Sequence, residues 1–112
     1  MEIKLKKNIS YFDTEYDRIE ILEYNDGNLA IVLKPANEDP SYDVVISVNL
    51  ASGFTYTHKD AFFADVNNVK GFIFDALEAQ GLIEKSTYTE QSGFVVYPAY
   101  FVSEEIAEMI GR

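Results

Sequence analysis

The sequence offers few side chains that could carry out chemistry. His58 is the only histidine, and the chain has no cysteine. Thiol catalysis is excluded, and pairs of a nucleophile with a histidine base or clusters of histidine metal ligands are nearly excluded. The lone histidine stands in the polar run Thr57-His58-Lys59-Asp60, which favours a solvated loop residue. Any catalysis would have to rely on carboxylates.

Asp60 and Asp65 are the two carboxylates that could perform acid–base chemistry together if a pocket held both of them. The run Asp65-Val66-Asn67-Asn68 is rich in oxygen ligands. A calcium loop, however, needs an oxygen at its fifth position and glycine at its sixth. Val69 and Lys70 stand there instead, so we interpret the run as a turn whose side chains bond backbone amides. We therefore expect no enzyme, no cofactor and no metal, with a small-ligand or metal-assisted enzyme at Asp60 and Asp65 as the alternative.

The balance of charge indicates the kind of partner. The 112 residues include 9 basic and 19 acidic side chains, a net charge of −10. Nucleic acids and anionic membranes attract cationic patches, so the sequence predicts that the chain binds neither directly. A basic protein surface is the expected partner. The length predicts one domain, residues 1–112, and with no leader or long apolar run we expect it in the cytoplasm.

Acidic residues concentrate between Asp13 and Asp26, where Arg18 is the only cation. Carboxylates two residues apart on a strand lie about 6.6–6.8 Å from each other. Phosphates on one DNA strand advance about 3.4 Å each, so a row of carboxylates could occupy a basic groove at every other phosphate. The alternative is a solvated edge that keeps a sheet monomeric. The candidate partner-binding residues are Asp13, Glu15, Asp17, Glu20 and Glu23.

The first half of the chain predicts strands that would carry these residues. Glu2–Lys6 alternates polar and apolar residues, and Asp26-Gly27 stands between two β-rich runs, Arg18–Tyr24 and Leu29–Leu33. A two-residue turn at Asp26-Gly27 would pair Tyr24 with Leu29. Leu22, Tyr24, Leu29, Ile31 and Leu33 would then share the buried face. A helix over Thr14–Glu23 is the competing interpretation, because Thr14-x-x-Asp17 resembles a capping box.

The second half predicts one more long strand, a helix and a second hairpin. Alternation over Tyr42–Leu50 predicts a strand of about nine residues, followed by a loop over Ala51–Asp60 and a short strand at Phe62–Ala64. The expected helix is capped by Asn68, closes at Gly81 and buries Val69, Phe72, Ile73, Ala76 and Leu77. A hairpin joins Glu84–Tyr88 to Phe94–Tyr97, and Ser103 caps a terminal helix. The fold class is therefore α+β: a mostly antiparallel sheet of five or six strands, with one main helix packed on one face and a short C-terminal helix.

The aromatic residues allow two interpretations. Eight Phe and eight Tyr replace the absent Trp and Cys as bulky side chains, which favours a role in the core. Tyr is also common at protein interfaces, so a binding surface stays open as the alternative. The tyrosines considered for such a surface are Tyr42, Tyr56, Tyr88, Tyr97 and Tyr100.

Three segments together carry a resemblance. They are Pro40-Ser41-Tyr42 with Ser47-Val48-Asn49-Leu50, then Phe63–Asn68, then Ser92–Pro98. Their order and spacing resemble a family of small bacterial proteins described only as a domain of unknown function, common on plasmids, phages and conjugative elements. The resemblance spans roughly Tyr42 to Val102 and implies no catalytic residue. Its motif positions, which are either structural or part of a shared surface, are Asn49, Asp65, Asn67, Asn68 and Tyr97.

These observations predict a non-catalytic interaction protein that binds a basic protein surface. The resemblance implies a setting on mobile elements, where small acidic proteins often inhibit host defences by occupying nucleic-acid grooves. A third hypothesis is a structural subunit of a larger assembly, which would expose an apolar patch above a few hundred Å².

Overall fold

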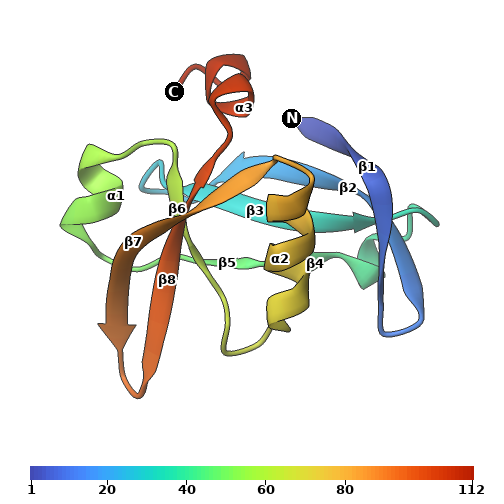
Figure 1. Ribbon diagram of the computed structural model, residues 1–112, viewed down its shortest axis with the longest axis horizontal. Helices are drawn as coiled ribbons and strands as arrows, with labels where there is room; N and C mark the ends of the chain where they lie inside the picture. Colours follow the sequence, from blue (N-terminus) through green and yellow to red (C-terminus); the bar gives the residue numbers. More distant parts are fainter.

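Two antiparallel four-stranded sheets make up most of the computed structural model, which describes all residues 1–112 (Figure 1). The first sheet has the order β1-β2-β3-β4, with β1 Glu2–Tyr11, β2 Thr14–Glu23, β3 Leu29–Pro35 and β4 Val44–Val45. The second has the order β5-β6-β8-β7, with β5 Ser47–Val48, β6 Ala61–Ala64, β7 Ile83–Ser92 and β8 Val95–Val102. The helices are α1 Gly53–Thr57, α2 Gly71–Ala79 and α3 Glu104–Met109, with a 3₁₀ turn at Pro40–Tyr42. The α+β class is confirmed, but the single sheet of five or six strands is wrong.

The chain changes sheets at Ile46, which is fully buried. β4 pairs with β3 in the first sheet, and β5 pairs with β6 in the second. The Ile46 amide donates to Ile31 O, and Ile46 O accepts from the Asp65 amide, so its backbone is bonded on both sides of the break. The continuous strand predicted over Tyr42–Leu50 is therefore wrong. Its alternation is genuine, but strands that turn a corner between two sheets keep the same alternation.

The hairpin of β2 and β3 is confirmed, but its register differs from the prediction by one residue. Glu23 pairs with Leu29 and Ile21 with Ile31, and Tyr24 accepts from the Gly27 amide. The turn has three residues, Asn25-Asp26-Gly27, with Gly27 at φ 86°. Three-residue turns of this kind end in a left-handed residue. A shift of one residue against β3 exchanges the buried and exposed faces of β2. Leu22 is therefore exposed, while Ile19 and Ile21 enter the core.

The helices follow the prediction in part. α2 and α3 are confirmed, Gly81 closes α2 at φ 75°, and Ser103 Oγ accepts from the Ile106 amide. Asn68 does not cap α2, because its side chain donates to Asp65 instead and Lys70 stands at the N-cap. Phe74 replaces Phe72 on the buried face. The predicted loop over Ala51–Asp60 contains α1, which the side chain of Ser52 caps.

One cluster of 21 buried residues joins the two sheets with helices α2 and α3. Ile19, Ile31 and Leu33 enter it from the first sheet, Phe62 from the second and Phe74 from α2, all almost fully buried. Burial of such side chains contributes roughly 1.5–3 kcal/mol each. This core fixes the base of each hairpin, while the hairpin ends project from it (Figure 1). No helix of the structure is long and apolar enough to span a bilayer.

Candidate interaction surface

The turn between β1 and β2 has an unusual backbone. Tyr11 pairs with Thr14, so the turn consists only of Phe12 and Asp13, at φ 48° and 59°. Three non-glycine residues of the chain have positive φ, and these are two of them. Two-residue hairpin turns with both central φ values positive normally carry Asn-Gly or Asp-Gly. A bulky residue in the left-handed region is an outlier, and here the outlier is a phenylalanine.

Phe12 is also 78% exposed, at the end of a hairpin that projects from the sheet. Tyr11, which is 6% exposed, supports it from below, with the two ring centroids 4.5 Å apart. The Tyr11 ring meets the half-exposed Phe72 of α2 edge-on at 5.7 Å, and its hydroxyl accepts from the Lys70 amide. The two exposed rings therefore stand beside a buried one that fixes their positions. We call Phe12, Asp13, Glu15 and Phe72 the hairpin-tip surface.

The five acidic candidates do not form one row. Thr14–Glu23 is a strand, so the helical alternative is wrong, and a bulge between Tyr16 and Arg18 interrupts its alternation. Asp13 lies in the turn and Glu15 just beyond it, both exposed and without an ion pair or side-chain hydrogen bond. Glu23 follows Ile19 and Ile21 on the opposite, core-facing side of the strand. Spacing along β2 alone therefore does not create the expected array.

Two of the five carboxylates are engaged by cations of the same sheet. Asp17 Oδ1 lies 3.2 Å from Arg18 Nε, which also lies 3.4 Å from a Glu2 oxygen. Glu20 lies 3.8 Å from Lys34 Nζ, and Asp43 binds that ammonium at 2.7 Å. The hydrogen bond to Asp43 raises the pKa of Lys34, so the cation stays charged. Because Glu23 lies against Arg112, these pairs leave Asp13 and Glu15 as the carboxylates of the five that are free to meet a partner.

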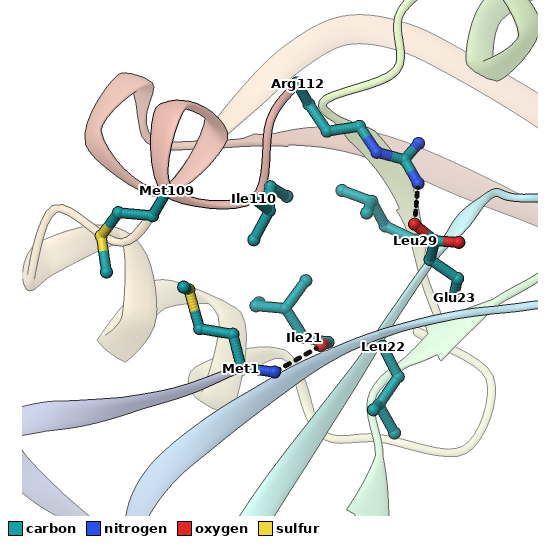
Figure 2. Close-up of a pocket in the computed structure, with 8 residues that line it drawn as sticks. All are labelled: Met1, Ile21, Leu22, Glu23, Leu29, Met109, Ile110 and Arg112. Atoms are coloured by element: carbon teal, nitrogen blue, oxygen red, sulfur yellow. Dashed lines mark hydrogen bonds and ion pairs between the residues drawn. The ribbon is translucent and has the colours of Figure 1, made fainter.

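Glu23 lies at an apolar pocket of about 220 Å³ between the ends of β2 and β3 and helix α3 (Figure 2). Its Oε1 is 2.6 Å from Arg112 Nη2. The side chains of Ile21 and Ile110 approach each other across the pocket, whereas Leu22 points away from it. Met1 and Met109, the only methionines of the chain, line the same pocket. Glu23 therefore holds the C-terminal residue in place.

Asp60 and Asp65 lie at opposite ends of β6, one residue beyond it on each side. Five residues of extended chain separate them by about 16 Å, so no single substrate group can contact both. Asp60 lines a shallow depression with Glu104, Glu108 and Arg112, while Asp65 lines no pocket. No group of three His, Asp or Glu side chains is arranged to hold a metal. His58 stacks on Phe54, with ring centroids 4.2 Å apart.

The family-motif positions mostly form local structure. Asn49 donates to Asp26 Oδ2 at 2.9 Å and accepts from the Asn28 amide group at 2.9 Å, which ties the β2–β3 turn to the end of β5. The hydrogen bond from Asn49 lowers the pKa of Asp26. Asp65 accepts from both the backbone amide and the side chain of Asn68.

The other two motif positions differ from each other. Tyr97 is buried in a small second cluster with Phe63 and Ala99, beneath the β7–β8 hairpin. Asn67 is exposed. Among the five motif positions, then, only Asn67 presents a side chain with no structural partner.

We compared the chain with family models, curated proteins and solved structures. None matches. The surface must therefore be interpreted from its own residues.

Two exposed phenylalanines were not predicted from the sequence. Phe94 stands at the tip of the β7–β8 hairpin, fully exposed, after Gly93 at φ 62°. The turn at Phe12 was not predicted because nothing in Tyr11-Phe12-Asp13-Thr14 resembles a turn sequence. Thr14 and Tyr16 face inward before the bulge of β2 and Ile19 and Ile21 after it, so alternation does not run unbroken back to residue 14. Of the tyrosines considered for a binding surface, Tyr97 and Tyr100 are buried, Tyr88 is partly buried, and Tyr42 and Tyr56 are exposed.

Proposed function

We propose that this chain is a non-catalytic binding protein that docks onto a cationic surface of a partner protein through the hairpin-tip surface. The observation that carries the proposal is Phe12, a phenylalanine that is both left-handed and largely exposed. Neither feature helps the chain to fold. Together they place an apolar side chain, held on a rigid turn, where a partner can enclose it.

The backbone of Phe12 supports a functional reason for its presence. A non-glycine residue held in the left-handed region costs roughly 1–3 kcal/mol, and such residues gather at binding and catalytic sites. Asn-Gly would form the same turn with less strain. A sequence that keeps Phe at this position therefore gives up stability, which is the usual cost where function selects the residue.

The charges around Phe12 suggest the chemistry of the partner. Asp13 follows Phe12 in the turn and Glu15 lies two residues further along β2, both exposed and without internal partners. Binding hot spots combine an aromatic anchor with a polar rim, so the complementary surface is an apolar pocket bordered by Lys or Arg. The net charge of −10, including Asp17, Glu20 and Glu23, would steer the chain toward such a surface and raise the rate of association.

Anchored docking fits the residues better than mimicry along a row of phosphates. Mimicry needs regularly spaced free carboxylates, whereas Asp17, Glu20 and Glu23 each lie against a cation of the same chain. A nucleic-acid-handling protein of the host remains the partner class that the resemblance to proteins of mobile elements suggests. On this proposal, the contact uses the tip and not the length of β2.

Photo-crosslinking tests the proposal directly. A photoreactive phenylalanine analogue is placed at position 12 in one protein and at position 94 in another, and each is irradiated in host lysate. Both positions are exposed phenylalanines at hairpin tips, so the second is a matched control. We expect a discrete crosslinked protein from position 12 that is absent from position 94. Equal products from both positions, or none from position 12, would contradict the proposal.

A further inference from the structure

A second groove lies at the other end of β1, between that strand, the end of α2 and α3. It measures about 220 Å³. Its apolar lining comes from Ile3, Leu82, Ile106 and Met109, and its polar lining includes Gln80, Ser103 and Glu105. An apolar cavity of about 150 Å³ is enough to hold benzene, so this groove has room for a phenyl ring.

Cations border this groove. Lys4 and Lys6 line it, Lys7 follows them on β1, and none of the three forms an ion pair within the chain. These three residues are a third of all basic residues in a strongly acidic protein. Two lysines and one carboxylate, Glu105, are the charged residues among its lining, and Glu104 lines the adjoining depression. It is thus a partly apolar groove with lysines at its edge, which is the chemistry that the hairpin-tip surface requires.

We propose that this groove receives Phe12 of a second copy of the chain, with Asp13 and Glu15 of that copy against Lys4 and Lys6. The inference rests on the proposed function, because it uses the same tip and adds a second occupant for it, another copy of this chain. An aromatic side chain enters the apolar floor, and two carboxylates meet two ammonium groups at the rim. Opposite charges placed in this way specify the partner and its orientation.

The hairpin-tip surface cannot reach the groove of its own molecule. Lys4 and Phe12 are eight residues apart on an extended strand, roughly 25 Å. Figure 1 shows the tip at the far end of β1 from the chain start. Contact between different patches on two copies is heterologous, so association proceeds head to tail. Repulsion between two chains of charge −10 is limited because the Debye length is about 8 Å at physiological salt.

Two variants, each lacking one surface, test this arrangement. Phe12→Asn removes the anchor while keeping a residue that favours the left-handed conformation. Lys4→Glu with Lys6→Glu reverses the charge at the rim of the groove, and both side chains are exposed. Sedimentation velocity is recorded for the wild type, each variant and their equimolar mixture, from about 10 µM to about 1 mM, the range of weak association. Circular dichroism verifies that both variants are folded.

We expect the wild type to associate progressively with concentration and each variant alone to remain a monomer, its association weakened about 30-fold or more. The mixture should form dimers and nothing larger, because only one intact tip and one intact groove remain between the two proteins. A monomeric wild type, or a variant that still associates alone, or a mixture that stays monomeric would overturn the inference. The proposed function would survive any of these results if position 12 still crosslinked to a host protein.

Discussion

Two hairpin tips of this protein each carry an exposed phenylalanine, but the backbone conformation of that residue differs between them. In the β7–β8 turn, Gly93 occupies the left-handed position, and the neighbouring Phe94 is exposed without a positive φ. In the β1–β2 turn, both positions have positive φ, and neither is glycine. An exposed phenylalanine costs little backbone energy at the first kind of site and a substantial amount at the second.

The comparison extends to what lies beneath each tip. Phe12 rests on Tyr11, which belongs to the main core and contacts Phe72 of α2. Phe94 has no aromatic partner, and the nearest cluster, around Tyr97, contains only three buried residues. A two-stranded ribbon that extends past its sheet is marginally stable. The strained tip is therefore the one with aromatic support from the core, as a preorganised binding site requires.

The largest difference should come from removing Tyr11, which supports the first tip, compared with removing Phe94 at the second tip. Tyr11→Ala should lower the free energy of unfolding by about 3–4 kcal/mol, because a large side chain leaves a cavity in the main core. Phe94→Ala should change it by less than about 0.5 kcal/mol, as expected of an exposed residue. Urea denaturation measures both. If the two variants unfold at the same midpoint, the first tip is not anchored in the core as described.

Relieving the backbone strain of the Phe12-Asp13 turn should stabilise the protein. Replacing Phe12-Asp13 with Asn-Gly supplies the residues that such a turn favours and should raise the free energy of unfolding by about 1–2 kcal/mol. The matched change, Phe94→Asn, should leave it unaltered because Gly93 already relieves that turn. Thermal unfolding detects the difference. A fall in stability of the Asn-Gly variant would indicate that the turn is not strained.

The carboxylates at the first tip should have a smaller effect, mainly on association rate. Asp13→Asn with Glu15→Gln should slow binding of the crosslinked partner several-fold at low salt, and the effect should fade at high salt. Glu84→Gln with Glu90→Gln on β7 is the control, because it also removes two negative charges. Stopped-flow association reports the rates. Equal slowing by both changes would show that net charge matters and position does not.

The smallest effect concerns Asp26 in the β2–β3 turn, whose carboxylate accepts a hydrogen bond from Asn49. Hydrogen bonding holds the pKa of Asp26 below its ordinary value of 3.8, chiefly through Asn49. The stability it contributes is therefore complete above pH 3.8 and is lost as the pH falls through the lowered pKa. Asn49→Ala should remove part of this dependence and shift acid unfolding to higher pH. An unchanged acid titration would contradict the role given to Asn49.

Local patterns predicted much of the fold. Alternation located most strands, and Ser103 and Gly81 marked helix ends. Both predicted hairpins formed, although β7 extends to Ser92 and Phe94 lies in the turn and not in a strand. The change of sheet at Ile46 could not be predicted, because apolar and polar residues alternate in the sequence both in a straight strand and in one that crosses between sheets. The register of β2 against β3 depended on whether the Asn25–Asn28 segment contained a two- or three-residue turn, which the sequence leaves open.

The candidate surface was predicted only in part. The acidic segment drew attention to Asp13 and Glu15 through composition alone. Sequence could not indicate that Lys34 of β3 would meet Glu20 of β2, because that contact depends on cross-strand register. Phe12 was missed for a different reason. Turn rules identify residues that favour a turn, so they fail where function has placed an unfavourable one.

The central claim is that Phe12 is retained for binding at the expense of stability. The most direct test is capture of the crosslinked partner by immobilised wild type, Phe12→Asn and Phe94→Asn, each verified as folded. We predict that Phe12→Asn, although at least as stable as the wild type, loses the partner, while Phe94→Asn retains it. If Phe12→Asn captures the partner as well as the wild type does, the strained tip has no role in binding and the account is wrong.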